Sequence, residues 1–262
     1  MKILILGDVY GHSGRRIVKT RLANMIAMTK ASFVVANGEN LAGGFGITKE
    51  SLDEMFAAGV DVVTAGNHTW DKKDALKLVE SEPRLLRPAN IPALAPGRGA
   101  GVFEKEGVKF GVLNLMGRVF MDAIDCPFQR AEAELVKLRE ETNIILVDMH
   151  AEASSEKKAM GYFLDGRVSV VYGTHTHVPT ADERILPRGT GFQSDVGMTG
   201  PIHSVIGVKT EIILKRFTQK LPERFEEAHG PAELNALLVE LNPVTGFVKT
   251  INRLHLEEET KA

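Results

Sequence analysis

The sequence has only one cysteine, Cys126, among its 262 residues. An internal disulfide is therefore excluded, and the scarcity of thiols agrees with a reducing compartment. The sequence also lacks an apolar stretch long enough to span a bilayer, and residues 1–7 lack the layout of a signal peptide. We therefore expect a cytoplasmic protein with no membrane partner.

An excess of charge of one sign is missing as well. The 32 lysines and arginines nearly balance the 34 aspartates and glutamates, so the formal net charge is -2. This balance gives no overall attraction to nucleic acid, so we do not favour nucleic acid as a partner. It stays possible, because a local basic patch is not excluded. The 44% of hydrophobic and 25% of charged residues are typical of a globular protein. Clear repeats and low-complexity segments are absent, so we expect one domain over residues 1–262.

Apolar runs and helical periodicities alternate along the sequence. The run at residues 2–7 predicts a strand, and the apolar spacing over residues 12–30 predicts a helix. Thr48 is a helix-capping residue, and Gly59 ends the helix that follows it. The other expected elements are strands at 33–35, 60–64, 143–148 and 167–172, helices at 128–141 and 154–164, hairpins within 102–113, 184–193 and 233–255, and a surface crossing at 81–101. This order predicts an α/β fold in which two packed β-sheets are flanked by helices.

Polar residues follow the apolar runs at the points where the runs stop. They are Asp8, the segment 37–40 with Glu39 and Asn40, the segment 66–68 with Asn67 and His68, then His150, and the segment 173–177 with His175 and His177. The carboxyl ends of parallel strands gather along one crevice, where ligands bind. Carboxylate, amide and imidazole groups together suit borderline metal ions, whereas an all-oxygen set suits magnesium or calcium. The pattern predicts a two-metal hydrolase centre.

Each of these residues also has a simpler structural interpretation. Asp8 is a candidate helix cap, Asn37-Gly38 is a turn signal, and His150 is a candidate buried histidine with satisfied hydrogen bonds. Asn67 and His68 are candidates for a turn that caps a helix starting near Asp71, and the two late histidines for exposed loop residues. These interpretations stay open one by one. All of them would have to hold at once on successive strand ends, which favours the metal centre.

Taken in order, these motifs resemble the calcineurin-like metallophosphoesterase superfamily, whose pattern is D-x-H, G-D-x-x-[DN], G-N-H-[DE], a strand-end H, and G-H-x-H. The corresponding segments are 8–10, 38–39, 66–69, 150 and 173–177. Two departures are Tyr10 in place of a histidine and Glu39 in place of an aspartate. The segments 37–40, 66–70, 195–201 and 216–225 resemble more specifically the YmdB-like bacterial branch, where His203 stands in place of an expected aspartate.

This resemblance implies an α/β/β/α sandwich and a phosphodiesterase acting on small phosphodiesters, with 2′,3′-cyclic or 3′,5′-cyclic AMP as substrate. It implies two metal ions, iron or manganese with zinc as an option, and attack by a metal-bridging hydroxide. Glu39 would bridge the ions and His68 would be catalytic, outside the metal shell. By the same resemblance one ion is held by Asp8, Glu39, Asn40 and His177, and the other by Glu39, Asn67, His150 and His175.

Two residues are candidate substrate contacts. Phe45 lies in the glycine-rich loop 41–46 and can stack on a base, although a packing role is as good an explanation. His12 is either an exposed residue of the first helical turn or a substrate contact. Two other functions compete with the phosphodiesterase: a nucleotide- or RNA-binding regulator with weak or no turnover, and a phosphomonoesterase or nuclease on the same centre. The C-terminal hairpin leaves a homo-oligomer open.

Overall fold

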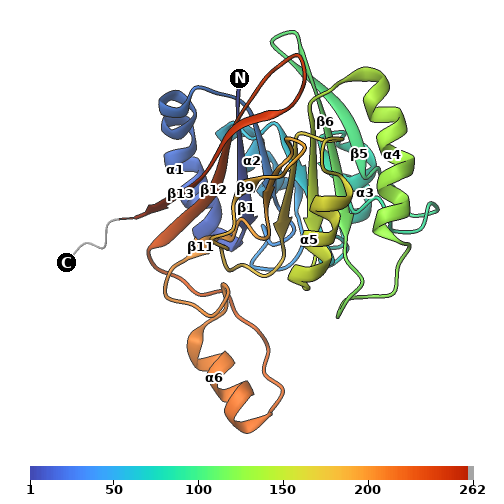
Figure 1. Cartoon of the computed structure of the whole chain (residues 1–262). Coiled ribbons are helices and arrows are strands. Elements are labelled where there is room, and N and C mark those ends of the chain that lie inside the picture. Colours follow the sequence, from blue (N-terminus) through green and yellow to red (C-terminus); the bar gives the residue numbers. More distant parts are fainter. Residues whose placement is uncertain (259–262) are drawn as a thin grey trace.

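Two β-sheets pack face to face in the computed structural model, and helices cover the outer face of each sheet (Figure 1). The structure describes residues 1–258, so the last four residues of the expected domain lie outside it. The first sheet has the strand order β13-β12-β11-β1-β2-β3-β4, and the second has the order β5-β6-β7-β8-β10-β9. This is the α/β/β/α arrangement that the sequence predicts.

The first sheet is parallel from β11 through β1 and β2 to β4, and β12 and β13 run antiparallel. Its strands are β1 Lys2–Val9, β2 Ala31–Asn37, β3 Val62–Thr64, β4 Leu85–Leu86, β11 Met198–Pro201, β12 Ala232–Leu241 and β13 Val248–Glu257. The predicted C-terminal hairpin is confirmed by the pairing of β12 with β13.

The second sheet has a parallel centre, β6-β7-β8-β10, with antiparallel strands at both edges. Its strands are β5 Ala100–Lys105, β6 Val108–Met116, β7 Ile145–His150, β8 Val170–Thr174, β9 Arg184–Ile185 and β10 Gly191–Gln193. The two other predicted hairpins are confirmed, since Lys105 pairs with Val108 and Ile185 pairs with Gly191.

Alternation along β1 explains how the layers are joined. Ile3 and Ile5 point into the apolar layer between the sheets, where Phe33 of β2 stacks on Phe110 of β6 with 4.1 Å between ring centroids. Leu4 and Leu6 point the other way and pack under the helices of the first sheet. Successive side chains of a strand face opposite sides, so one apolar run serves two cores.

Helices α1 and α2 cover the first sheet, and α4 and α5 cover the second. The helices are α1 Gly11–Thr29, α2 Lys49–Ala58, α3 Ala75–Ser81, α4 Pro127–Glu141, α5 Ser154–Phe163 and α6 Thr210–Gln219. Thr48 caps α2 through the amide of Ser51, and Gly59 ends it at a φ of 110°, as predicted. None of the helices within residues 1–258 has the length and apolar character needed to cross a membrane.

Two parts of the fold differ from the expectation. The segment 81–101 is not only a surface crossing, because Leu85 and Leu86 are buried and pair with β3 as the short strand β4. A pair of residues is too short to give a periodic signal. Helix α6 is not among the elements that the sequence predicts. It belongs to the segment between β11 and β12, residues 202–231, which we call the α6 excursion. The helix itself stands away from the sheets (Figure 1).

Candidate metal centre

The predicted ligands come together where the strands of both sheets end. Asp8 comes from β1 and His150 from β7, and the other side chains come from the loops after β2, β3 and β8. Among these predicted ligands, two groups of three have candidate ligand atoms within 4.8 Å of one another. The groups are Glu39, His150 and His175, and Asp8, Glu39 and His177. Glu39 is common to both, which is the geometry expected of a residue that bridges two ions.

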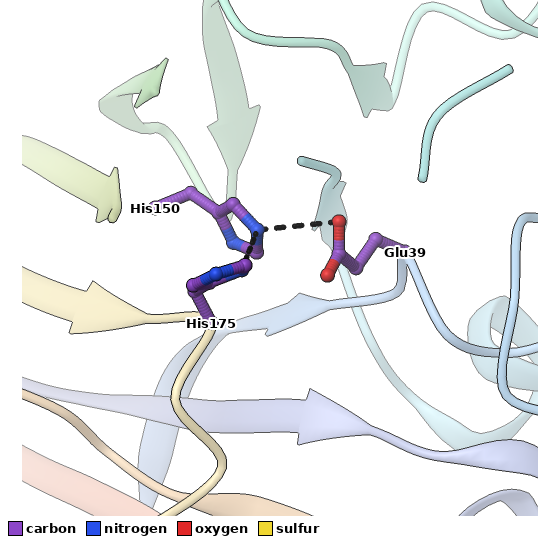
Figure 2. Close-up of side chains that lie close together, drawn as sticks. All are labelled: Glu39, His150 and His175. Carbon is purple, nitrogen blue, oxygen red and sulfur yellow. Dashed lines mark hydrogen bonds and ion pairs between the residues drawn. The ribbon is translucent and has the colours of Figure 1, made fainter. Parts of the chain in front are cut away.

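The Nε2 atom of His150 is the point on which several of these side chains converge (Figure 2). It lies 3.2 Å from Oε2 of Glu39 and 3.1 Å from Nδ1 of His175. The amide oxygen of Asn67 is 3.0 Å away. Gly66 lies against the same atoms, and a Cβ at that position would clash with both His150 Nε2 and Glu39 Oε2. The glycine of the G-N-H motif is therefore required by close approach.

Hydrogen bonds behind His150 orient its ring. Thr174 donates its hydroxyl hydrogen to Asp148 over 2.7 Å, so its oxygen accepts from Nδ1 of His150 at 2.9 Å. Nε2 is then the nitrogen that faces Glu39, and it holds a proton in the charged ring or offers a lone pair to a cation. An oxygen or nitrogen lone pair faces it from each of Glu39, Asn67 and His175, and only a proton or a cation among them satisfies all four. Such support behind a ligating histidine is characteristic of metal sites.

The His175–His177 turn has an unusual backbone. His175 has a φ of 94° and His177 a φ of 65°, values that residues other than glycine seldom adopt. Nδ1 of His177 donates to the carbonyl of Ile206 over 2.8 Å, which leaves its Nε2 for a ligand. The amide of His175 donates to both carboxylate oxygens of Asp8, at 3.2 and 3.1 Å. Strain of this kind persists where surrounding contacts hold it.

A buried ion pair supplies such contacts beneath the turn. Nζ of Lys157 lies 2.6 Å from Oδ2 of Asp195, and the two side chains are 2% and 1% exposed. The same carboxylate oxygen accepts from the amide and the hydroxyl of Thr176, at 3.2 and 2.7 Å. Thr176 stands between the two histidines. The sequence did not indicate this role for either member of the ion pair. Lys157 is on α5 and Asp195 follows β10, so the two residues are far apart in the sequence.

Burial and neighbouring charges shift the pKa values of four titratable groups at the centre in different directions. Burial lowers the pKa of His150, but the carboxylates of Glu39, Asp8 and Asp148 together raise it to about 9. Burial raises the pKa of Glu39, but the charge and hydrogen bond of His150 together with His68 outweigh burial and bring this pKa down to about 2. Burial and His150 lower the pKa of His175 to about 3, and burial also lowers the pKa of His177. His175 and His177 are therefore neutral at neutral pH, which is the form that binds metals.

Two buried polar atoms on the other side of Glu39 have no hydrogen-bond partner within the described part of the chain. They are Oδ1 of Asn40 and the hydroxyl of Tyr10. The amide group of Asn40 is already oriented, since Nδ2 donates to the carbonyl of Gly44 over 2.8 Å. Buried acceptors are rarely left unpaired. An unpaired amide oxygen beside the Asp8–Glu39–His177 group fits a cation ligand, so the residues present suit two metal ions.

His68 lies beside the centre, in neither metal-ligand group. Its Nδ1 is 2.7 Å from Oδ2 of Asp71, and its amide donates to Oε2 of Glu39 over 3.1 Å.

The alternative that this turn caps a helix is wrong, because α3 begins at Ala75 and its capping residue, Asp74, makes no side-chain cap. Asp8 does not cap α1 either. The carboxylate at the start of that helix is Glu227, which accepts from the amide of His12 over 2.5 Å.

A pocket of about 290 Å³ opens on the centre. Phe45 lines it, and its role as a substrate contact stays a prediction. His12 and His203 are exposed and are not among the lining residues. The lining residues that the sequence did not indicate are Glu152, Thr176, Ile206, Val208 and Phe225. Glu152 is 3.3 Å from Nε2 of His175. Its position two residues after a strand-end histidine is the one signal that sequence reasoning could have used.

Comparisons with known proteins cover nearly the whole chain. A family model described as YmdB-like protein matches residues 4–254. A 2′,3′-cyclic-nucleotide 2′-phosphodiesterase of Bacillus subtilis strain 168 is 42% identical over 259 residues, which cover 99% of this chain and 98% of the relative. The predicted family is thereby confirmed, and the predicted activity is the one in the name of this relative.

Two solved structures have the same fold. A hypothetical protein from Thermus thermophilus is 42% identical and superimposes with a TM-score of 0.93, covering 99% of this chain and 100% of that chain. A novel phosphatase of Mycoplasma pneumoniae is 35% identical with a TM-score of 0.94, covering 100% of this chain and 95% of that chain.

Proposed function

The chain belongs to the YmdB-like protein family, and from this premise we propose that it is a metal-dependent phosphodiesterase of small phosphodiesters, with 2′,3′-cyclic nucleotides as the leading substrate class. The observation that carries the proposal is the pair of ligand groups joined by Glu39. The name of the B. subtilis relative supports the choice of a cyclic nucleotide, and the M. pneumoniae relative is called a phosphatase.

The side chains that converge support two metal sites. We assign one site to Asp8, Glu39, Asn40 and His177, and the other to Glu39, Asn67, His150 and His175. The mixture of carboxylate, amide and imidazole ligands favours iron, manganese or zinc over magnesium. Two such ions, when bound, activate a water molecule for attack and neutralise charge on the phosphoryl oxygens.

His68 is the proposed general acid. Asp71 accepts the proton on Nδ1 and fixes the ring, so Nε2 is the atom that donates a proton to the leaving ribose oxygen. The amide of His68 donates to Glu39, so the position of the imidazole is tied to that of the bridging carboxylate. A fixed distance between the attacked phosphate and the proton donor is what catalysis by positioning requires.

The pocket supports a small substrate. Its volume of about 290 Å³ lies at the lower end of the range for small-molecule sites. The net charge of -2 gives no pull toward long nucleic acid. A cytoplasmic location is part of the same proposal, because a cytoplasmic enzyme would meet nucleotide substrates at physiological concentrations.

The test is a substrate panel run on protein reconstituted separately with iron, manganese and zinc. The panel contains 2′,3′-cyclic AMP, 3′,5′-cyclic AMP, bis-p-nitrophenyl phosphate and adenosine monophosphates. We expect turnover of the diesters with at least one metal, and loss of turnover in a Glu39→Gln variant. Faster hydrolysis of the monoesters would favour the phosphomonoesterase alternative. Nucleotide that binds without product in all three metal forms would favour the regulatory alternative.

A further inference from the structure

Aromatic side chains from two distant parts of the sequence meet at the wall of the pocket. Phe45 comes from the loop after β2, and Phe225 comes from the α6 excursion. Their rings are nearly parallel, with an angle of 16° and 6.3 Å between centroids. Both side chains are half-buried and line the pocket together with His68. The rings thus form an aromatic pair in the pocket lining, next to the proposed proton donor.

The backbone of the loop that carries Phe45 fixes the position of this side chain. Gly44 and Gly46 on either side have φ values of 89° and 74°, which favour glycine. A Cβ at Gly44 would meet the hydroxyl of Tyr10, and one at Gly46 would meet the side chain of Lys72. The ring of Phe45 packs edge-on against His68, with 5.1 Å between centroids. The loop continues directly from Glu39 and Asn40, so the ring is fixed relative to the metal ligands.

Phe225 is held equally well. It packs against a cluster of buried apolar residues formed by Tyr10, Met198, Val208 and Ile213. The guanidinium of Arg216 lies 4.7 Å from its ring centroid, in the geometry of a cation–π contact. Two residues later, Glu227 ties the α6 excursion to the first turn of α1. The ring is therefore a fixed part of the pocket wall.

We propose that Phe45 and Phe225 form the base-binding wall of the site, and that the α6 excursion thereby sets a preference for phosphodiesters that carry a nucleobase. The inference rests on the proposed function. A substrate whose phosphate lies at the metal ligands and whose leaving oxygen faces His68 has its next group at Phe45. Stacking on aromatic rings is the common, sequence-tolerant means of holding a base. A substrate that lacks an aromatic group gains nothing from this wall.

The test compares two substrates with the same five-membered cyclic phosphodiester, 2′,3′-cyclic AMP and glycerol 1,2-cyclic phosphate. Phe225→Leu and Phe45→Leu keep an apolar side chain but remove the aromatic face. For each variant we expect kcat/KM on cyclic AMP to fall roughly 5- to 50-fold, mostly through KM. On the base-free ester we expect a change of less than about twofold. Phe217→Leu is the matched control, because Phe217 lies on α6, is 75% exposed and does not line the pocket.

Equal losses on both substrates would overturn the inference, since they would mean that the rings only fasten the excursion to the body. Unchanged kinetics on cyclic AMP would overturn it as well. Calorimetric binding of adenosine 2′-monophosphate and glycerol 2-phosphate to the metal-loaded protein separates this failure from failure of the proposed function. If the adenosine compound binds more tightly and this advantage is lost in both leucine variants, the base-binding wall is supported. This holds even if neither cyclic ester is hydrolysed. The absence of hydrolysis would contradict only the phosphodiesterase proposal.

Discussion

Nε2 of His150 lies 3.2 Å from Oε2 of Glu39, although the two residues belong to different sheets. His150 ends β7 of the second sheet, and Glu39 follows β2 of the first. Each sheet therefore contributes part of the candidate centre, and the apolar layer between the sheets, including the stacked Phe33 and Phe110, sets the spacing of the ligands.

Replacing His68 by alanine should remove the proton donor without disturbing the metals. His68 is in neither ligand group, and its side chain bonds to Asp71 instead. We expect kcat on a cyclic phosphodiester to fall by roughly 10²- to 10⁴-fold, the usual contribution of general acid–base catalysis, while the metal content stays the same. His12→Ala is the control, since His12 is exposed and outside the pocket. Near-normal turnover in His68→Ala would remove this assignment.

Replacing Lys157 by methionine should destabilise the protein strongly. The substitution leaves the Asp195 carboxylate buried without its cation. We expect a loss of about 3–5 kcal/mol in the free energy of unfolding, measured in urea. Lys158→Met is a neighbouring control, because Lys158 is half-exposed and 3.8 Å from Asp182, so its loss should be about 0–1 kcal/mol. A loss below about 1 kcal/mol for Lys157→Met would contradict a role for this ion pair in holding the histidine turn.

Replacing Tyr10 by phenylalanine should not lower the stability of the metal-free protein. The Tyr10 side chain is 2% exposed, and its hydroxyl has no hydrogen-bond partner among residues 1–258. An unpaired buried hydroxyl costs about 1–3 kcal/mol. We therefore expect the free energy of unfolding to stay the same or to rise by about 1 kcal/mol, whereas Tyr162→Phe at an exposed position should change nothing. A clear loss of stability in Tyr10→Phe would show that the hydroxyl has a partner, such as an ordered water.

Removing the metals should lower thermal stability reversibly. Asp8 and Glu39 are buried together, and burial and the Asp195 charge already raise the pKa of Asp8 well above its usual value. Bound cations relieve this repulsion, and a ligand at 100 times its Kd stabilises a protein by about 2.7 kcal/mol. We expect a chelator to lower the Tm and added manganese to restore it. A Tm that ignores both treatments would speak against specific metal binding.

Residues at strand ends could be predicted because their signal is local. An apolar run followed by glycine and a polar residue, as at Asn37-Gly38-Glu39 and Gly66-Asn67-His68, marks the carboxyl end of a buried strand. The same runs indicated the two sheets and their helices. Whether the assembled residues bind metal, and whether the chain forms one domain or an oligomer, stay predictions.

Contacts between distant segments could not be predicted, because no local pattern marks them. The pairing of β12 with β1, between Leu237 and Ile5 for example, joins opposite ends of the sequence. Lys157 looks like any lysine of a polar helix until Asp195 is placed beside it. Phe225 follows α6, a helix that the sequence did not predict, and only the folded α6 excursion brings it to Phe45.

The proposed centre consists of two metal ions joined by Glu39, and metal content measures this directly. Purified protein, stripped and then reconstituted with iron or manganese, should hold two ions per chain by elemental analysis. Glu39→Gln removes the charged carboxylate that both groups share, so it should hold fewer than two. A wild-type protein that takes up no metal, or a Glu39→Gln variant that keeps two, would contradict the account.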